Sequence, residues 1–359
     1  MTYRRELFAV RPRQMQEQLK VGTAIARRGE LQKGVIKGIE LNTTTSIDIP
    51  VLVMNGAKDG PTMLMVSTQH GIEIQGIEVI RRIMREEVDP KTLRGTIIGI
   101  PVENPLAFMH HQYLSWIDNQ DLGGGGSASP LTADRPSGTA TERLAHVLWQ
   151  EAWSKADMVL NMHTNVRPDS LFFTEINIGN PKTKDKLERM AKVFGVTNVV
   201  ENVPIADDAP DTLANLAVKN GVPDILIEFI DGRWISEPST SVGVRGTLNI
   251  MKEFDMIDGS IEPQEGIIII PGICTSHGIV RANHGGLIRF LKTPGDLLKK
   301  GEIFAEIYDL YGDILEQVSC PVDGYIWAYP CGDILGTPGS LQAVQTGANI
   351  AYVFTSNKQ

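Results

Sequence analysis

The sequence predicts an α/β protein in which helices cover both faces of a mostly parallel or mixed sheet, followed by a smaller all-β domain. Strand-like and helix-like segments alternate up to about residue 260, which is typical of βαβ units. Short β-like runs separated by Gly and Pro replace this alternation in the rest of the chain. The length of 359 residues also exceeds one typical domain. We therefore expect an α/β domain at 1–260 and a β-rich C-terminal domain at 261–359.

The first part of the chain is expected to hold a lead-in, two strands and a helix. Residues 1–34 are polar with some helical character. Two β-rich runs follow, and the sequence Asp59-Gly60-Pro61 between them predicts a turn. The next segment has apolar residues at helical spacing, which predicts a helix: Ile74, Ile77, Ile80 and Met84.

The alternation continues beyond this helix. Buried strands are predicted at 95–105, 156–165 and 223–231. Helices are predicted at 140–153, 182–195, 211–221 and 242–257, and an irregular segment is predicted at 118–139. Such an order of elements favours a sheet that is buried on both faces.

Charge and hydropathy exclude several classes of protein. The formal net charge is -9, and no run of Lys and Arg supplies the basic face that nucleic acid requires. The start of the sequence lacks an apolar core of signal-peptide length, and no apolar run reaches membrane-spanning length. We therefore expect a cytoplasmic protein with neither a nucleic-acid nor a membrane partner.

His70 and Glu73 lie where the first well-formed buried strand meets its helix. Ligands collect at the carboxyl ends of strands in an open parallel sheet, so this turn is a preferred place for chemistry. The three-residue spacing lets both side chains converge on one point. A His-x-x-Glu pattern also arises by chance, so its position carries more weight than its existence.

His163 follows another buried strand of the same region. Two histidines and a glutamate can hold a tetrahedral zinc ion and leave the fourth position to water. Each histidine alone is more simply a hydrogen-bonded structural residue, but the three together at strand ends favour a metal site. The sequence therefore predicts one Zn²⁺ per chain at His70, Glu73 and His163, although manganese, cobalt or nickel suit the same ligands.

Glu228 is a lone carboxylate in a predicted buried strand. Strand alternation directs Ile225, Ile227 and Phe229 to one face and Glu228 to the other. A buried unpaired carboxylate is costly and has a raised pKa, and water activated by zinc would give it a task as general base and then general acid. The alternative is a strand-end glutamate that reaches solvent.

These residues, in this order, resemble the succinylglutamate desuccinylase and aspartoacylase family, zinc metallohydrolases related to the zinc carboxypeptidases. The segment "QHGIE" is similar to the family's His-Gly-x-Glu turn, "PVENPLAF" to its Asn-Pro segment, "NMHT" to its second histidine and "LIEF" to its catalytic glutamate. The β-like tail also resembles the family's C-terminal domain. The resemblance therefore covers nearly the whole chain.

The resemblance implies a zinc-carboxypeptidase-like fold and a deacylase, an amidohydrolase that cleaves the amide bond of a small N-acylated amino acid or related amide. His70, Glu73 and His163 would hold the zinc ion, and Glu228 would transfer the proton. The small N-acyl compound is then the expected partner, and homo-oligomerisation stays open.

One segment departs from the family pattern. Family members carry Asp-Leu-Asn-Arg here, with another arginine slightly upstream that stabilises the oxyanion, whereas this chain has Asp121-Leu122 followed by Gly123-Gly124. Glycine cannot bind a carboxylate bidentately, so Arg167 is a candidate for that role. His111 or Gln112 could replace the oxyanion arginine as hydrogen-bond donors, and both are equally well explained as surface-loop residues. We therefore expect a substrate preference that differs from that of aspartoacylase.

Other interpretations stay open. The glycine-rich run at 122–129 lacks the Lys-Ser/Thr of a phosphate loop and is expected to form a mobile rim over the site. A carboxypeptidase-like peptidase and a catalytically impaired zinc-binding or ligand-binding protein are alternatives. A biotin or lipoate carrier is disfavoured, because the C-terminal part has no lysine flanked by methionines.

Overall fold

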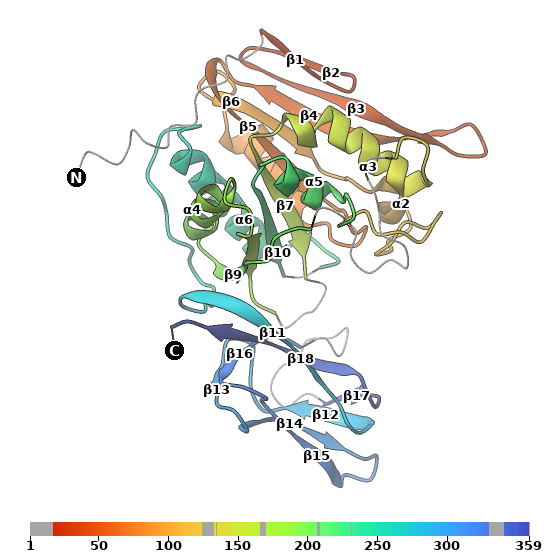
Figure 1. Cartoon of the computed structure of the whole chain (residues 1–359), viewed down its shortest axis with the longest axis vertical. Coiled ribbons are helices and arrows are strands. Elements are labelled where there is room, and N and C mark those ends of the chain that lie inside the picture. Colours follow the sequence, from red (N-terminus) through yellow and green to blue (C-terminus); the bar gives the residue numbers. More distant parts are fainter. Residues whose placement is uncertain are drawn as a thin grey trace.

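The computed structural model describes residues 17–123, 133, 135–165, 170–206, 209–230, 232–329 and 341–358. The strands of its large sheet are β3 (Glu30–Glu40), β4 (Ser46–Asn55), β5 (Lys58–Ser67), β6 (Arg94–Ile100), β7 (Met158–Thr164), β8 (Phe173–Asn177), β9 (Thr197–Glu201), β10 (Asp224–Phe229), β11 (Ile273–Arg281), β13 (Leu297–Leu298), β16 (Gly324–Ala328) and β18 (Asn349–Ser356). Within the described residues these twelve strands lie in the order β13-β16-β18-β11-β9-β8-β10-β7-β5-β6-β4-β3 (Figure 1).

The helices lie in the α/β part of the molecule. They are α1 (Gln75–Arg82), the π-helix η1 (Ile83–Glu87), α2 (Pro105–Phe108), α3 (Ala140–Glu151), the 3-10 helix η2 (Trp153–Lys155), α4 (Lys184–Phe194), α5 (Leu213–Lys219) and α6 (Glu237–Glu253). In the part of the chain that the structure describes, no helix has the length and apolarity needed to cross a membrane.

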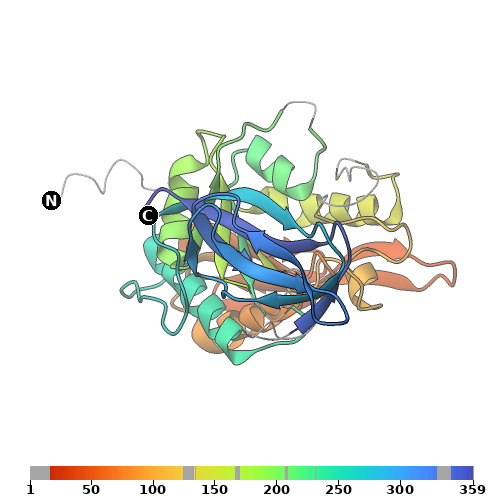
Figure 2. The ribbon, with the colours of Figure 1, turned by 90° about the horizontal axis from the view of Figure 1, so that it is seen from below.

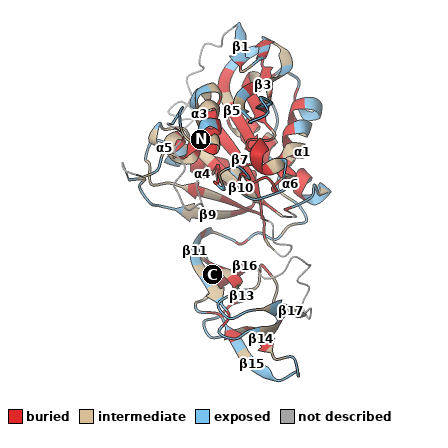
Figure 3. Ribbon diagram, turned by 90° about the vertical axis from the view of Figure 1, so that its right-hand side faces the viewer, coloured by how far each residue is buried: buried red, intermediate tan, exposed pale blue. Residues whose placement is uncertain are grey.

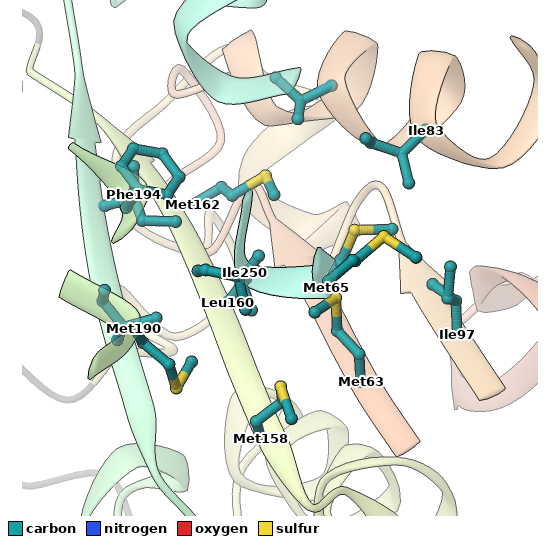
Figure 4. Packing of buried hydrophobic residues seen from close by; sticks show 14 of the residues in the cluster. Met63, Met65, Ile83, Ile97, Met158, Leu160, Met162, Met190, Phe194 and Ile250 are labelled. Carbon is teal, nitrogen blue, oxygen red and sulfur yellow. The ribbon is translucent and has the colours of Figure 1, made fainter. Parts of the chain in front are cut away.

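Helices cover both faces of the large sheet. On one face α1, η1, α4 and α6 bury a cluster rich in methionine, in which Met63, Met65, Met158 and Met162 from the strands pack beneath the helices (Figure 4). On the other face α2, α3, η2 and α5 bury a second cluster with β4, β5 and β6. Burial of such apolar area is the main stabilising contribution to folding.

The C-terminal part joins the α/β part through its strands. β11 pairs with β9 in parallel over two residue pairs and with β18 in antiparallel, so the large sheet continues from one part into the other. A second sheet in the order β15-β14-β12-β17 closes the C-terminal core, which lies below the α/β part in Figure 1 and in front of it in Figure 2. Its strands are β12 (Gly286–Phe290), β14 (Ile303–Tyr308), β15 (Ile314–Ser319) and β17 (Leu341–Val344).

The prediction of an α/β class is confirmed in a coarser form. The structure has a large mixed sheet with helices, plus an antiparallel β region at the C-terminal end. The domain boundary at residue 260 falls between α6 and β11 and stays a prediction. Buried residues gather in the centre of the α/β part and within the C-terminal core (Figure 3).

Two expectations for the N-terminal region were wrong. The expected partly helical lead-in at 1–34 is contradicted from residue 18 onward, where β1 (Gln18–Val21) and β2 (Ala24–Arg27) make a small hairpin and β3 follows; residues 1–16 lie outside the described residues. Val21, Ala24 and Ala26 in this hairpin are buried against the large sheet, so tertiary packing decides their conformation.

The Asp59-Gly60-Pro61 sequence does not form the turn that it predicts. These residues lie inside β5, and the preceding strand β4 ends at Asn55. β6 lies between β4 and β5, so the two strands do not form a hairpin. The close approach of Gly60 to the backbone of Arg94 explains the glycine, because a Cβ there would lie 2.6 Å from Arg94 C.

Candidate active site

The turn that carries His70 and Glu73 begins with a strained residue. β5 ends at Ser67, and Thr68 adopts a φ of 61°, which is rare for a β-branched side chain. Its hydroxyl lies 3.2 Å from Glu73 O and 3.1 Å from Pro101 O and can donate to either. The strain is held by these contacts and directs the chain away from the strand, so that His70 and Glu73 lie at its carboxyl end.

The "PVENPLAF" segment supports this turn from behind. The Asn104 side chain donates to Gln69 O at 3.0 Å, and its Oδ1 accepts from Ala107 N at 3.1 Å, which caps α2. Gly71 packs directly on α2, because a Cβ there would lie 2.1 Å from Ala107 C. The Asn-Pro and His-Gly motifs are therefore parts of one packed unit.

His70, Glu73 and His163 come together as one buried cluster. Their ligand atoms all lie within 4.8 Å of one another, and the residues are only 5–7% exposed. Glu73 Oε1 lies 2.9 Å from His70 Nδ1, and Glu73 Oε2 lies 2.9 Å from His163 Nδ1. The three predicted ligands therefore converge from the α1 turn and from β7.

The polar atoms of this cluster are incompletely satisfied. His70 Nδ1 is within ion-pair distance of Glu73 but lacks hydrogen-bond alignment, and His163 Nε2 is buried without a hydrogen-bond partner among the described residues. Unpartnered buried polar atoms are rare unless they have a ligand. Two imidazoles and a carboxylate are a donor set that zinc accepts, so these residues fit the ion.

The charges of the cluster depend on one another. Burial would lower the pKa of His70, but the charge of Glu73 and the hydrogen bond with Asp121 outweigh it and raise this pKa to about 10. Burial would raise the pKa of Glu73, but the charge of His70 and the hydrogen bond from His163 lower it to about 2. The carboxylate is thus held in its charged form, as a metal ligand must be.

Asp121 holds the other side of the His70 ring. Its Oδ1 lies 3.1 Å from His70 Nε2 and accepts from Gly123 N at 2.8 Å. A Cβ on Gly123 would lie 3.0 Å from Gln69 Oε1 and 3.8 Å from His70 Nε2, so a side chain here would press on the turn. Tyr113 stacks on the same ring, with centroids 3.7 Å apart and an interplanar angle of 15°.

Glu228 lies beside His163 on the neighbouring strand. The two residues are register partners in the parallel pairing of β10 with β7. Ile225, Ile227 and Phe229 are buried on the opposite face, as the alternation predicts. Glu228 Oε2 is buried without a hydrogen-bond partner, and burial together with the charge of Glu73 raises the pKa of Glu228 to about 8.

The candidates for contact with the substrate or the oxyanion are His111, Gln112 and Arg167. His111 and Gln112 are exposed and follow α2, and the His111 ring lies 6.3 Å from that of Phe108. No contact between either residue and the His70 cluster is found among the described residues, and their role stays a prediction. Arg167 and most of the glycine-rich run lie outside the described residues.

Sequence reasoning missed several residues around the cluster. Asp121 was noted only as part of an incomplete motif, and its pairing with His70 needed the fold. Tyr113 gave no periodic signal. Glu103, whose Oε1 accepts from Trp153 Nε1 at 2.6 Å, is fully buried, and the adjacent Asn-Pro motif was the one available pointer to it.

A buried His-Glu-His cluster at strand ends of a helix-covered mixed sheet defines a candidate metal-dependent hydrolase. The sequence matches the family described as "Succinylglutamate desuccinylase/Aspartoacylase catalytic domain" over residues 59–254. This match spans more than half of the chain, and the chain therefore belongs to that family.

Individual relatives are more distant. The chain is 22% identical over 267 residues, 74% of this chain and 75% of the relative, to the N-alpha-acetyl-L-2,4-diaminobutyric acid deacetylase of Halomonas elongata. Its fold is similar to a succinylglutamate desuccinylase/aspartoacylase from Rhodobacter sphaeroides, with a TM-score of 0.73, 24% identity and coverage of 91% and 96% of the two chains. It is also similar to the product-bound ectoine utilization protein EutE (DoeB) from Ruegeria pomeroyi, with a TM-score of 0.72, 20% identity and coverage of 91% and 95%.

Proposed function

We propose that this chain is a zinc-dependent deacylase that hydrolyses the amide bond of a small N-acylated amino acid or related amide. The observation that carries the proposal is the convergence of His70, Glu73 and His163 within 4.8 Å, with the half-buried Glu228, whose Oε2 is buried, on the adjacent strand. Family membership and the deacetylase activity in the name of the Halomonas relative support the same reaction class.

The proposed reaction needs metal binding, proton transfer and orientation of a ligand, and different residues have these roles. His70, Glu73 and His163 would hold Zn²⁺, which when bound lowers the pKa of water and polarises the substrate carbonyl. Glu228 takes a proton from the attacking water and passes it to the leaving nitrogen. A pKa near 8 suits this residue to both steps, because it can accept and return a proton near neutral pH. Asp121 fixes the orientation of His70.

The remaining roles concern the substrate. His111 or Gln112 would donate hydrogen bonds to the oxyanion, and Arg167 would bind a substrate carboxylate if one is present. Gly123 and Gly124 offer no such group, so the substrate preference should differ from that of aspartoacylase. A cytoplasmic location stays part of the proposal.

The test is metal content. Purified parent protein is compared with Glu73→Ala and His163→Ala. His146→Ala is the matched control, because His146, on α3, donates from Nδ1 to Ala133 O and lies outside the cluster. We expect about one zinc per chain in the parent and the control, and none in the other two variants. No stoichiometric metal in the parent after zinc reconstitution would contradict the proposal.

Measurement of activity beside zinc content distinguishes proton transfer by Glu228 from metal binding. Glu228→Gln should keep the zinc and lower kcat on N-acyl amides by about 10²- to 10⁴-fold. Glu188→Gln, on the exposed face of α4, serves as the control and should keep its activity.

A further inference from the structure

Several large apolar side chains are exposed in the segment between α2 and Asp121. Four large side chains within residues 109–117, here called the aromatic segment, are at least 40% exposed: Met109 (52%), Tyr113 (41%), Trp116 (43%) and Ile117 (40%). Exposed apolar surface that gathers in one place on a folded protein usually marks a binding site.

The aromatic segment has a defined conformation. The N–H groups of His110 and Gln112 donate to Ala107 O at 3.3 and 3.1 Å, and Asn119 N donates to Ser115 O at 2.9 Å. The His110 ring also lies 4.8 Å from that of Trp116. A surface ordered in this way before binding loses little entropy when a ligand arrives.

One side chain of this segment touches the candidate metal centre. Tyr113 stacks on His70 at 3.7 Å, and although His70 is only 7% exposed, Tyr113 remains 41% exposed. The tyrosine ring therefore lies between a metal-ligand candidate and solvent. A substrate whose amide reaches His70 and Glu73 would pass along this ring.

The aromatic segment lacks the lysines and arginines that usually bind a carboxylate. Residues 109–134 contain no Lys or Arg. Asp118, the acidic residue next to the segment, uses both carboxylate oxygens on the backbone N–H and hydroxyl of Thr141. Apart from the hydrogen-bonding side chains of His110, His111 and Gln112, the chemistry offered to a ligand is aromatic and aliphatic, which suits an uncharged flat or apolar group.

We infer that the aromatic segment binds an aromatic or aliphatic group of the substrate, so that N-acyl amides with such a group are preferred over acidic ones. Tyr113 is the main specificity-determining residue, and Trp116 extends the same surface. The inference rests on the proposed amide hydrolysis and adds the substrate class to it.

The test compares substrates on the zinc-loaded full-length protein. N-hexanoylglycine and N-benzoylglycine are compared with N-acetylglycine and N-succinylglycine, and N-acetylphenylalanine with N-acetylaspartate. We expect at least one apolar compound to exceed its acidic counterpart by about tenfold or more in kcat/KM. This ratio should fall to about twofold in Tyr113→Ala. Tyr311→Ala is the matched control and should keep the parent ratio, because Tyr311 is 95% exposed at the β14–β15 turn.

A second measurement needs no turnover. Binding of benzoate, hexanoate and succinate to the parent and to Tyr113→Ala is followed by calorimetry. A Tyr113-dependent preference for the apolar acids without any amide hydrolysis would support the inference while the proposed reaction fails. Amide hydrolysis with equal or better use of acidic substrates, or a ratio unchanged by Tyr113→Ala, would overturn the inference and leave the reaction intact.

Sedimentation velocity tests whether a second copy of this chain, rather than a substrate, covers the aromatic segment. If Tyr113→Ala or Trp116→Ala converts a dimer into a monomer, the aromatic segment is an interface between copies of this chain, and the inference is overturned. An unchanged oligomeric state in both variants supports the substrate as the occupant.

Discussion

Asp121 Oδ1 lies 3.1 Å from His70 Nε2, on the side of the ring opposite Glu73. A carboxylate in this position decides which nitrogen would keep its proton when a cation binds: Nε2 would stay protonated toward Asp121, and Nδ1, which faces Glu73, would exchange its proton for the metal. It also makes the imidazole a stronger ligand. The pairing therefore explains why Asp121 is buried although it is not itself a ligand candidate.

Removal of this carboxylate should weaken metal binding. We expect Asp121→Ala to lower zinc affinity by about 10- to 100-fold, measured by competition with a chelator. Asp118→Ala is the matched control, because Asp118 lies in the same segment but bonds Thr141 at the start of α3. An equal loss of zinc affinity in both variants would mean that the effect comes from a disturbed segment and not from His70.

A methyl group at Gly71 should disturb the site through packing. The Cβ would lie 2.1 Å from Ala107 C, and backbone cannot yield as a flexible side chain does. We expect Gly71→Ala to lower the free energy of unfolding by about 2 kcal/mol or more, measured by urea denaturation. A Cβ on Gly285 would have its nearest atoms 3.5 Å away, so Gly285→Ala should change the free energy of unfolding only slightly. A neutral Gly71→Ala would show that α2 is not packed against the turn.

Glycine at residue 111 should stabilise the protein. His111 has a φ of 50°, a conformation that glycine adopts without strain. We expect His111→Gly to raise the free energy of unfolding by about 0.5 kcal/mol, since strain relief exceeds the added entropy of the unfolded chain. The same variant tests the proposed donor role, because loss of kcat with retained zinc would support it, whereas full activity would exclude it.

Glu103 should make stability depend on pH. Burial, opposed by hydrogen bonds from Trp153 and Gln69 and reinforced by the charge of Asp224, raises the pKa of Glu103 from 4.5 to about 8. A raised carboxyl pKa means that the folded state keeps a proton which the unfolded chain releases. The stabilising contribution is complete below pH 4.5 and is lost as the pH rises to about 8.

Glu103→Gln removes this titration but keeps an acceptor for Trp153 Nε1. We expect the parent to lose about 3 kcal/mol more than the variant between pH 5 and pH 8, measured by urea denaturation. The surface variant Glu188→Gln should follow the parent. Parallel pH profiles for the parent and Glu103→Gln would mean that Glu103 is charged in the folded state.

The sequence was most informative where periodicity and burial agree. The helix after the turn, the buried strands that carry His163 and Glu228, and the convergence of the three candidate ligands all follow the predicted positions. The helix, however, buries Val79, Ile80, Ile83 and Met84 more deeply than Ile74 and Ile77, so the predicted stripe was partly shifted.

The elements that were missed depend on tertiary contacts. β8 and β9 are five residues each and become strands by pairing with β10 and with each other. The hairpin of β1 and β2 is polar in part and folds because its apolar side packs against the large sheet. Asp121 and Tyr113 reach His70 across an irregular segment, and no local pattern specifies such a path.

The junction between β9 and β11 has a consequence for shortened forms of this chain. Two residue pairs and an aromatic cluster containing Phe173, Trp327 and Phe354 hold the C-terminal strands against the α/β part. Deletion of everything after residue 260 would leave β9 as an open sheet edge beside an uncovered apolar face. Open edges recruit strands from other molecules, so the isolated catalytic part should aggregate even though every proposed metal ligand lies within it.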